Sequence, residues 1–90
     1  MKIIVFSDSH GSPRALSRAI EKNIAGLDLC VFLGDGTDDA VLALEAYPSL
    51  PRIIVSGNRE EYLSSFLTVP PFPFEAEFEE QGVKFLALHG

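Results

Sequence analysis

The chain has 90 residues, of which 13 are acidic and 7 are basic, giving a formal charge of -6. A chain of this length supports one domain with a thin core, so residues 1–90 are predicted to form a single domain. With 47 % hydrophobic residues the chain is too apolar to be disordered, and its apolar runs are too short to cross a bilayer. The acidic balance disfavours nonspecific nucleic-acid binding, so a globular protein without a membrane partner is expected.

The N-terminal segment and the cysteine content both bear on the cellular compartment. One lysine and the run "IIVF" precede Ser7 and Asp8, which falls short of the apolar core of about 7 to 15 residues that a signal peptide needs. We therefore expect a cytoplasmic location. The single cysteine, Cys30, lies in an apolar run and cannot form an internal disulfide, so it is expected to be a buried, inert thiol.

Apolar runs and helix signals alternate from the start of the chain. Ile3–Phe6 is a continuous apolar run rich in β-branched residues, which predicts a strand covered on both faces. Ser12 can cap the free amides of a helix, Pro13 suits its first position, and Gly26 is its expected stop. Leu29–Leu33 is predicted to form a second buried strand.

The same alternation continues to residue 58. A second helix is expected after the "GDG" turn, with Thr37 or Asp38 as its cap and Pro48 just beyond its end. Ile53–Val55 forms a third short strand, and the "SGN" segment at 56–58 is predicted to be a tight turn in which glycine and asparagine tolerate left-handed conformations. The order β-α-β-α-β predicts an α/β fold with a parallel sheet.

The last third of the chain has a different pattern. A short helix is expected over 62–67, followed by a proline-rich loop or extended segment over 69–74. Apolar and acidic residues alternate from Phe74 to Glu79, which predicts a half-exposed strand. The Gln81-Gly82 turn leads into the apolar segment 83–90, so a C-terminal β-hairpin is expected.

Polar residues follow each predicted strand at short distances. Asp8 and Asp35 lie two positions beyond the first and second strands, Asn58 lies three beyond the third, and His89 ends the last, with His10 close behind Asp8. The carboxyl ends of parallel strands meet at one edge of an open α/β sheet, where ligands bind. We therefore expect these five side chains to converge.

Such a set of donors is suited to divalent cations. Carboxylate and amide oxygens with imidazole nitrogens suit Mn, Fe, Ni, Zn or Mg, and the lack of a thiolate argues against a structural zinc or an iron–sulfur centre. A carboxylate can bridge two cations about 3.5 to 4 Å apart, which together polarise a phosphoryl oxygen and lower the pKa of a water molecule. Asp35, which lies between two glycines, is the expected bridging residue.

Each of these motifs also has a simpler interpretation when taken alone. Asp8 and Ser9 could form an Asx turn, "GDG" and "GN" are ordinary turn sequences, and His89 could be a histidine at a frayed terminus. Turns do not require metal-compatible residues at four separate strand ends. The combination therefore favours a common site.

Together the motifs resemble a known family. "DSHG" with Asp8 and His10, "GDG" with Asp35, "GNRE" with Asn58 and "LHG" with His89 resemble the D-x-H, G-D, G-N and H-G blocks of the calcineurin-like metallophosphoesterases. Within that superfamily the chain is most similar to the small bacterial and archaeal phosphodiesterases. The resemblance implies a four-layer α/β/β/α sandwich, of which this chain would supply the N-terminal half.

The resemblance also implies a chemistry and a ligand set. It implies a dinuclear site for two divalent metal ions, Mn first among the candidates, that hydrolyses phosphomonoesters or phosphodiesters. By position Asp8, His10 and Asp35 would hold one metal ion, and Asp35, Asn58 and His89 would hold the other. The expected partner is a phosphate-ester substrate.

The chain departs from the family pattern in two ways. Many members carry a histidine after the asparagine as general acid, whereas this chain has Arg59 after Asn58. Arginine stays protonated and cannot readily release a proton, but it can bind a phosphate through two hydrogen bonds. Arg59 is therefore expected to bind substrate, together with Asn58. The later G-H-x-H block, which would give one histidine to each metal ion, does not occur in residues 1–90.

The second departure leaves three interpretations open. The chain is an N-terminal fragment of a longer enzyme, or a second chain or homo-oligomer completes the site, or the remainder has been lost. In each case we expect the ninety residues alone to bind metal weakly and to show little or no turnover.

Two other functions fit parts of the sequence. A non-catalytic scaffold on the same fold could use the aromatic, proline-rich segment 69–74 as an anchor surface. A flavodoxin-like nucleotide-binding domain would fit the β-α-β order, but no G-x-G-x-x-G or G-x-x-x-x-G-K loop follows any predicted strand. The leading hypothesis is a metal-dependent phosphodiesterase, with the scaffold as the alternative.

Overall fold

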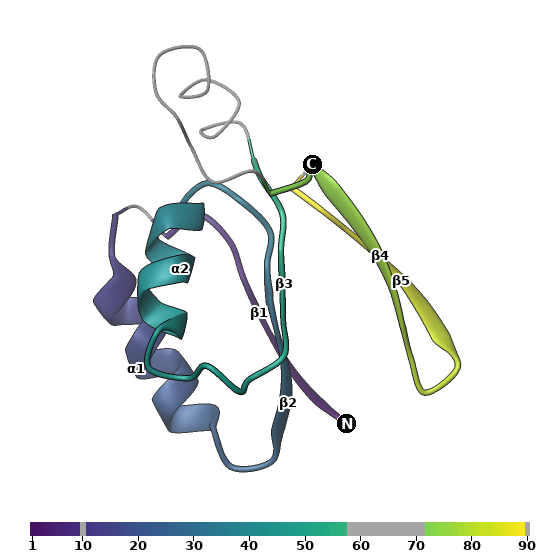
Figure 1. Cartoon of the computed structure of the whole chain (residues 1–90), viewed down its shortest axis with the longest axis horizontal. Coiled ribbons are helices and arrows are strands. Elements are labelled where there is room, and N and C mark those ends of the chain that lie inside the picture. The colour runs from purple at the N-terminus through teal and green to yellow at the C-terminus, as the bar shows by residue number, and fades with distance from the viewer. Residues whose placement is uncertain (10, 58–71, 90) are drawn as a thin grey trace.

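The computed structural model describes residues 1–9, 11–57 and 72–89, and it has the predicted α/β order with a C-terminal hairpin (Figure 1). The elements are β1 (Lys2–Phe6), α1 (Pro13–Asn23), β2 (Leu27–Phe32), α2 (Thr37–Leu44), β3 (Arg52–Ile54), β4 (Glu75–Glu80) and β5 (Val83–Leu88). The helix expected over 62–67 and the first part of the proline-rich segment lie outside the described residues.

The first three strands form a parallel sheet in the order β1-β2-β3. Val5 is opposite Val31, and Phe32 is opposite Ile54. Each crossover moves one position in the same direction, and crossovers of one handedness then place both helices on the same face of the sheet. Figure 1 shows α1 and α2 together on that face. The loops that follow the three strands consequently meet at one edge.

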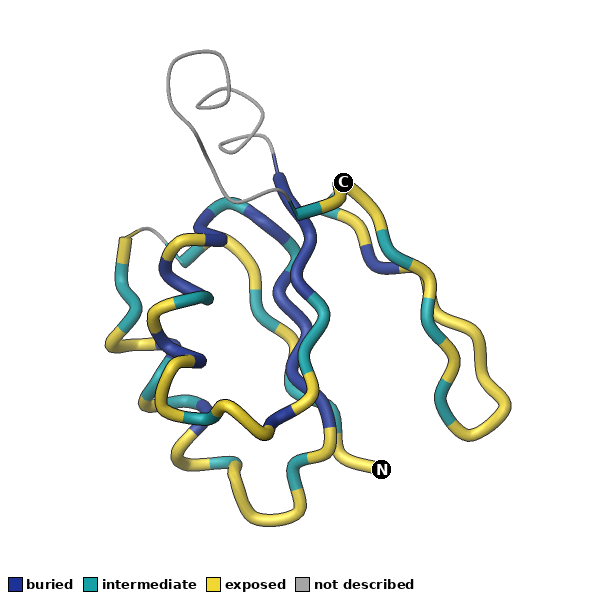
Figure 2. Tube along the Cα trace, in the orientation of Figure 1, coloured by how far each residue is buried: buried dark blue, intermediate teal, exposed yellow. Residues whose placement is uncertain are grey.

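The core between the helices and the sheet is built from the apolar residues of the helix and strand patterns. Its buried members are Leu16 and Ile20 of α1, Ala40, Ala43 and Leu44 of α2, and Cys30, Phe32, Leu50 and Ile54 from the sheet and its loops. In Figure 2 these positions fall in the dark blue stretches of the tube. Ser12 caps α1 as predicted, because its hydroxyl accepts a hydrogen bond from the Ala15 amide.

The antiparallel hairpin of β4 and β5 lies on the other side of the sheet (Figure 1). Its Ala76, Phe78 and Ala87 pack against a second buried cluster that includes Val31 and Val55 of the sheet side. Exposure alternates along β4, as the sequence predicts for a half-exposed strand. The described residues therefore form three layers, helices, sheet and hairpin, consistent with half of the four-layer sandwich.

The segment that enters the hairpin is attached to the end of β3. Ser56 is buried, its amide donates to the Pro73 carbonyl at 2.7 Å, and its hydroxyl donates to the Phe72 carbonyl at 2.9 Å. Phe72 packs against the core on the helix side, whereas Phe74 is 55 % exposed. The hairpin is thus held at the same edge of the sheet where the strand-end loops gather.

Two expectations about packing and capping are wrong. β1 is the outer strand of the parallel sheet, and it is not covered on both faces, because its Val5 is 56 % exposed. Neither Thr37 nor Asp38 caps α2: the N-cap is Gly36, with φ 139° and no side-chain capping bond. The chain turns into the helix through a backbone conformation that glycine adopts readily. The helix therefore begins at Thr37, one residue earlier than a cap at Thr37 would give.

Within residues 1–9, 11–57 and 72–89, neither α1 nor α2 has the length and continuous apolar character needed to traverse a bilayer.

Candidate metal centre

Asp8 and Asp35 occupy equivalent places after neighbouring parallel strands, and both have left-handed backbones. Their φ angles are 52° and 61°. Residues other than glycine rarely adopt this region, although aspartate tolerates it better than most, and such outliers concentrate at functional sites. The two loops are joined directly, because the Asp8 amide donates to the Gly34 carbonyl at 3.0 Å and the Ser9 amide donates to the Asp35 carbonyl at 3.2 Å.

Gly34 and Gly57 allow the β2 and β3 loops to approach closely. A Cβ atom on Gly34 would lie 2.6 Å from the Gly57 nitrogen, which is closer than real Cβ contacts. A Cβ atom on Gly57 would lie 2.6 Å from Asp35 Oδ1 and 2.9 Å from His89 Cγ. Gly57 is not among the described glycines with positive φ, so this position does not use the left-handed conformation that glycine tolerates. Glycine is needed there because Asp35 and His89 pack over it.

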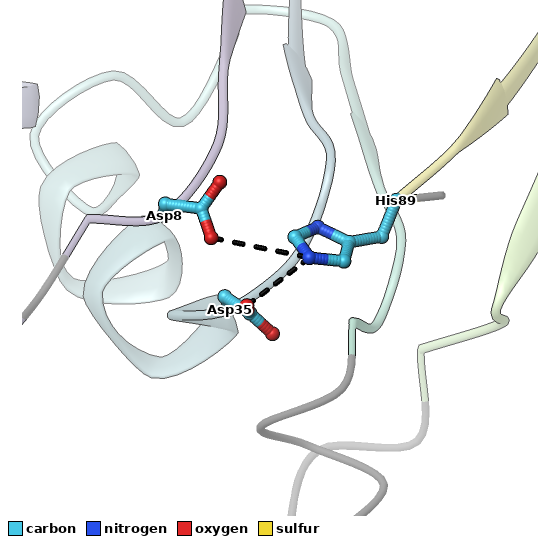
Figure 3. A group of neighbouring side chains, drawn as sticks. All are labelled: Asp8, Asp35 and His89. Carbon is cyan, nitrogen blue, oxygen red and sulfur yellow. Dashed lines mark ion pairs between the residues drawn. The ribbon is translucent and has the colours of Figure 1, made fainter.

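His89 follows β5 and reaches the site from the hairpin. Its Nδ1 lies 2.8 Å from the Leu33 carbonyl oxygen. A carbonyl only accepts hydrogen bonds, so Nδ1 carries the proton and donates it, and this contact fixes the orientation of the ring. The opposite nitrogen, Nε2, then faces the two carboxylates, 3.1 Å from Asp35 Oδ2 and 3.9 Å from Asp8 Oδ1 (Figure 3).

The three side chains satisfy the geometric requirements of a cation site. One ligand atom from each lies within 4.8 Å of the others. Metal–ligand bonds of about 2.0 to 2.2 Å place neighbouring donors about 3 to 3.5 Å apart, so the Asp35–His89 distance already fits and the Asp8–His89 distance needs only a small adjustment. The backbone contact to Nδ1 is the kind of outer contact that orients a metal-binding histidine through its other nitrogen. The donor set therefore fits a divalent cation.

The site is open on the side of Asp8. The side chains of His89 and Asp35 are 16 % and 23 % exposed, whereas that of Asp8 is 45 % exposed. Two carboxylates face one imidazole, so without a bound metal ion the cluster attracts a cation rather than an anion. A ligand can enter from solvent without any movement of the sheet.

The predicted convergence is observed for three of the five candidate metal ligands. Asp8, Asp35 and His89 come together from three separate loops, although the first and the last are 81 positions apart in the sequence. His10, Asn58 and Arg59 lie outside the described residues, so their predicted roles stay predictions. The same holds for the assignment of Asp35 as a bridge between two metal ions.

The sequence pattern did not identify three contributors to the site. They are the Leu33 carbonyl that orients His89, the steric role of Gly57, and the hydrogen bond from the Ser9 hydroxyl to Asp39. A backbone carbonyl carries no residue-type signal. In the sequence, Ser9 indicates only a possible Asx turn, and two consecutive aspartates in a first helical turn do not reveal that Asp39 is buried.

Comparison with known proteins gives one family. No match was found among curated proteins or among solved structures. The model of the calcineurin-like phosphoesterase superfamily domain matches residues 1–90, which is the whole chain. Its match agrees with the α/β fold and with the cluster of metal-compatible side chains at the strand ends. The chain thus belongs to the calcineurin-like phosphoesterase superfamily.

Proposed function

We propose that this chain carries the N-terminal ligands of a metal-dependent phosphoesterase that hydrolyses phosphodiester bonds. Membership of the superfamily supports phosphoesterase chemistry in general. The observation that carries the metal dependence is the arrangement of His89, whose Nδ1 is held by a backbone carbonyl while Nε2 faces Asp8 and Asp35. A histidine with a purely structural role would not need two carboxylates opposite its second nitrogen.

Two divalent cations, with Mn(II) preferred, would bind at the edge of the sheet. Asp8, His10 and Asp35 would hold one, and Asp35, Asn58 and His89 would hold the other. Bound there, the cations would polarise a phosphoryl oxygen and lower the pKa of a water molecule.

The residues of the chain position the reacting groups. The left-handed backbones of Asp8 and Asp35 direct both carboxylates to one point, and the Leu33 carbonyl keeps Nε2 of His89 directed there. Arg59 binds the phosphate of the substrate through two hydrogen bonds, because its guanidinium stays charged and matches the geometry of two phosphate oxygens. Asn58 lies next to it in sequence and contacts the same phosphate.

A cytoplasmic location belongs to the same proposal. It is supported by Cys30, which is buried and unpaired, as is usual for proteins of reducing compartments.

Metal binding tests the proposal without requiring turnover. Mn(II) is titrated into the chain, and the free ion is followed by its electron paramagnetic resonance signal, which also detects weak binding. We expect Asp35→Asn to lower the affinity at least tenfold, because it removes a charged ligand from the centre of the cluster. The matched control is Asp28→Asn, which makes the same change at an exposed position at the start of β2, near the opposite end of that strand.

Hydrolysis of bis-p-nitrophenyl phosphate is the second measurement. Any activity of the chain should require Mn(II), disappear with a chelator and be lost in Asp35→Asn. Equal Mn(II) affinity of the wild type and Asp35→Asn would contradict the proposed centre. Capture of a protein partner that persists unchanged in chelator, with no metal binding at all, would favour the scaffold instead.

A further inference from the structure

Asp39 is a buried carboxylate close to the candidate metal centre, in the first turn of α2. It is 4 % exposed, and its Oδ2 accepts a hydrogen bond from the Ser9 hydroxyl. Within the described part of the chain, no lysine, arginine or histidine pairs with Asp39, and Ser9 is its only side-chain partner. Burying a carboxylate without a cation is costly. The helix N-terminus and this hydrogen bond are the two interactions that offset the cost.

Ser9 is attached to the β2–α2 segment at two points. Its amide donates to the Asp35 carbonyl at 3.2 Å, and its hydroxyl donates to Asp39. Gly36 makes room for this arrangement, because a Cβ atom on Gly36 would collide with the Ser9 hydroxyl oxygen. The residue directly after Asp8 is therefore fixed to the segment that carries Asp35.

The conformation of Asp8 needs such a restraint. Its backbone is left-handed with φ 52°, which costs an L-residue about 1 kcal/mol. The Asp8 side chain is 45 % exposed, and among the described residues it interacts only with His89, at 3.9 Å. That contact is too long to hold the backbone in place, so the restraint comes from the hydrogen bond of the Asp8 amide to the Gly34 carbonyl and from the neighbouring residue, Ser9.

We propose that Asp39 is a positioning residue for the metal centre, and that it acts through the Ser9 hydroxyl to hold Asp8 in its left-handed conformation. This inference rests on the proposed function. Without the Ser9–Asp39 hydrogen bond, Asp8 relaxes toward negative φ, and its carboxylate turns away from Asp35 and His89. The loss then affects metal affinity through geometry, because neither Ser9 nor Asp39 is itself a ligand in the cluster.

The first test needs no metal. Amide hydrogen exchange is measured by NMR in the wild-type chain, in Ser9→Ala and in Asp39→Ala, whose side chain cannot accept a hydrogen bond. We expect the Asp8 and Ser9 amides, which donate to Gly34 and Asp35, to exchange at least tenfold faster in both variants. The Val55 amide, which donates to the Phe32 carbonyl at 2.9 Å within the sheet, is the internal reference and should change less than twofold.

The second test is the Mn(II) titration on the same proteins. We expect Ser9→Ala and Asp39→Ala each to weaken binding at least fivefold. The double variant should bind no more weakly than the single variant with the lower affinity, because both substitutions remove the same hydrogen bond. Asp28→Ala serves as the control for loss of one negative charge.

The outcomes separate this inference from the proposed function. Additive losses in the double variant, or lower thermal stability with unchanged exchange at Asp8 and Ser9, would show that Asp39 only stabilises the fold. Unchanged Mn(II) affinity in both single variants, with normal binding by the wild type, would overturn the positioning role alone. A wild-type chain that binds no Mn(II) would overturn the proposed function and the positioning role together.

Discussion

The two faces of the parallel sheet are packed to different degrees. Between the two helices and the centre of the sheet, the side chains leave a cavity of only about 10 Å³, and a hollow of about 560 Å³ opens on this face beside Pro48, Ile54 and Phe72. On the hairpin face, a cleft of about 300 Å³ runs between the sheet and the hairpin, with Ile3 and Leu33 on one wall and Phe78 and Phe85 on the other. Figure 1 shows the hairpin diverging from the sheet toward its turn.

The difference matters because the candidate metal centre draws on both faces. Asp8 and Asp35 follow strands that the helices support, whereas His89 is supplied by the loosely packed hairpin. The contacts that keep His89 in place are local: its hydrogen bond to Leu33 and the burial of Ala87 two residues earlier. A cation bound by both Asp35 and His89 would link the hairpin to the sheet, and metal binding should therefore stabilise the docked hairpin.

The largest effect on stability and on Mn(II) affinity is expected at Gly57, where the hairpin meets the sheet. A methyl group there would lie 2.8 Å from the Asp35 nitrogen as well as against Asp35 Oδ1 and His89 Cγ. We expect Gly57→Ala to lower the free energy of unfolding by about 3 kcal/mol, because the crowded atoms include backbone and cannot all move aside. Mn(II) affinity should fall at least tenfold. Denaturant unfolding and the Mn(II) titration measure the two effects.

Gly26→Ala is the matched control for this substitution. Gly26 has φ +75°, and a Cβ atom there meets nothing within 4 Å. We expect a cost of about 1 kcal/mol from the backbone alone, with Mn(II) affinity unchanged. Equal losses of stability in the two variants would mean that the contacts around Gly57 are not tight.

The second prediction separates the hairpin from the rest of the fold. Ala87 is 5 % exposed and packs against the sheet, so Ala87→Asp would place a carboxylate in an apolar cluster. We expect the hairpin to undock, with a loss of about 2 kcal/mol in the free energy of unfolding. Mn(II) affinity should fall because His89 leaves the site, while amide protection in β2, Leu27–Phe32, is retained.

Leu86→Asp is the control for the second prediction, because Leu86 is the neighbouring residue and is 54 % exposed. It should cost less than about 0.5 kcal/mol and leave Mn(II) affinity unchanged. Loss of amide protection throughout β2 in Ala87→Asp would show that the hairpin and the helix-backed sheet unfold as one unit.

The sequence predicted the tightly packed part of the molecule well. Apolar periodicity and the Ser12-Pro13 pair located β1, α1 and β2, because local propensity and tertiary packing favour the same structure there. The alternation of Phe78 and its neighbours with glutamates likewise located the half-exposed strand β4. The convergence of Asp8 and Asp35 followed from the topology of the parallel sheet, whereas His89 reaches them from the separate hairpin.

Features that depend on three-dimensional contacts were not predictable in this way. A strand expected to be buried leaves Val5 exposed, because this residue lines the open cleft between the sheet and the hairpin. The start of α2 depends on φ 139° at Gly36, and the role of Gly57 depends on which side chains pack over it. The sequence shows that a glycine is present but not whether its φ angle or its lack of a side chain is required.

The smallest predicted effect concerns the helix face and depends on pH. Burial raises the pKa of the Cys30 thiol from 9.0 to about 11, and the charge of Arg52 offsets part of that shift. Below pH 9 the thiol is protonated in both the folded and unfolded states, so its contribution to stability is fully present. Between pH 9 and pH 11 the unfolded chain loses the proton while the folded chain keeps it, so stability falls as pH rises.

Denaturant unfolding of the wild type and Cys30→Ala at pH 7 and pH 10 isolates this effect. The cavity left by Cys30→Ala lowers stability equally at both pH values. A difference between the two proteins in how much stability they lose from pH 7 to pH 10 therefore comes from the thiol. We expect the wild type to lose about 1 kcal/mol more than Cys30→Ala between pH 7 and pH 10. Equal losses would indicate that water reaches Cys30, and the helix face would then be no better sealed than the hairpin face.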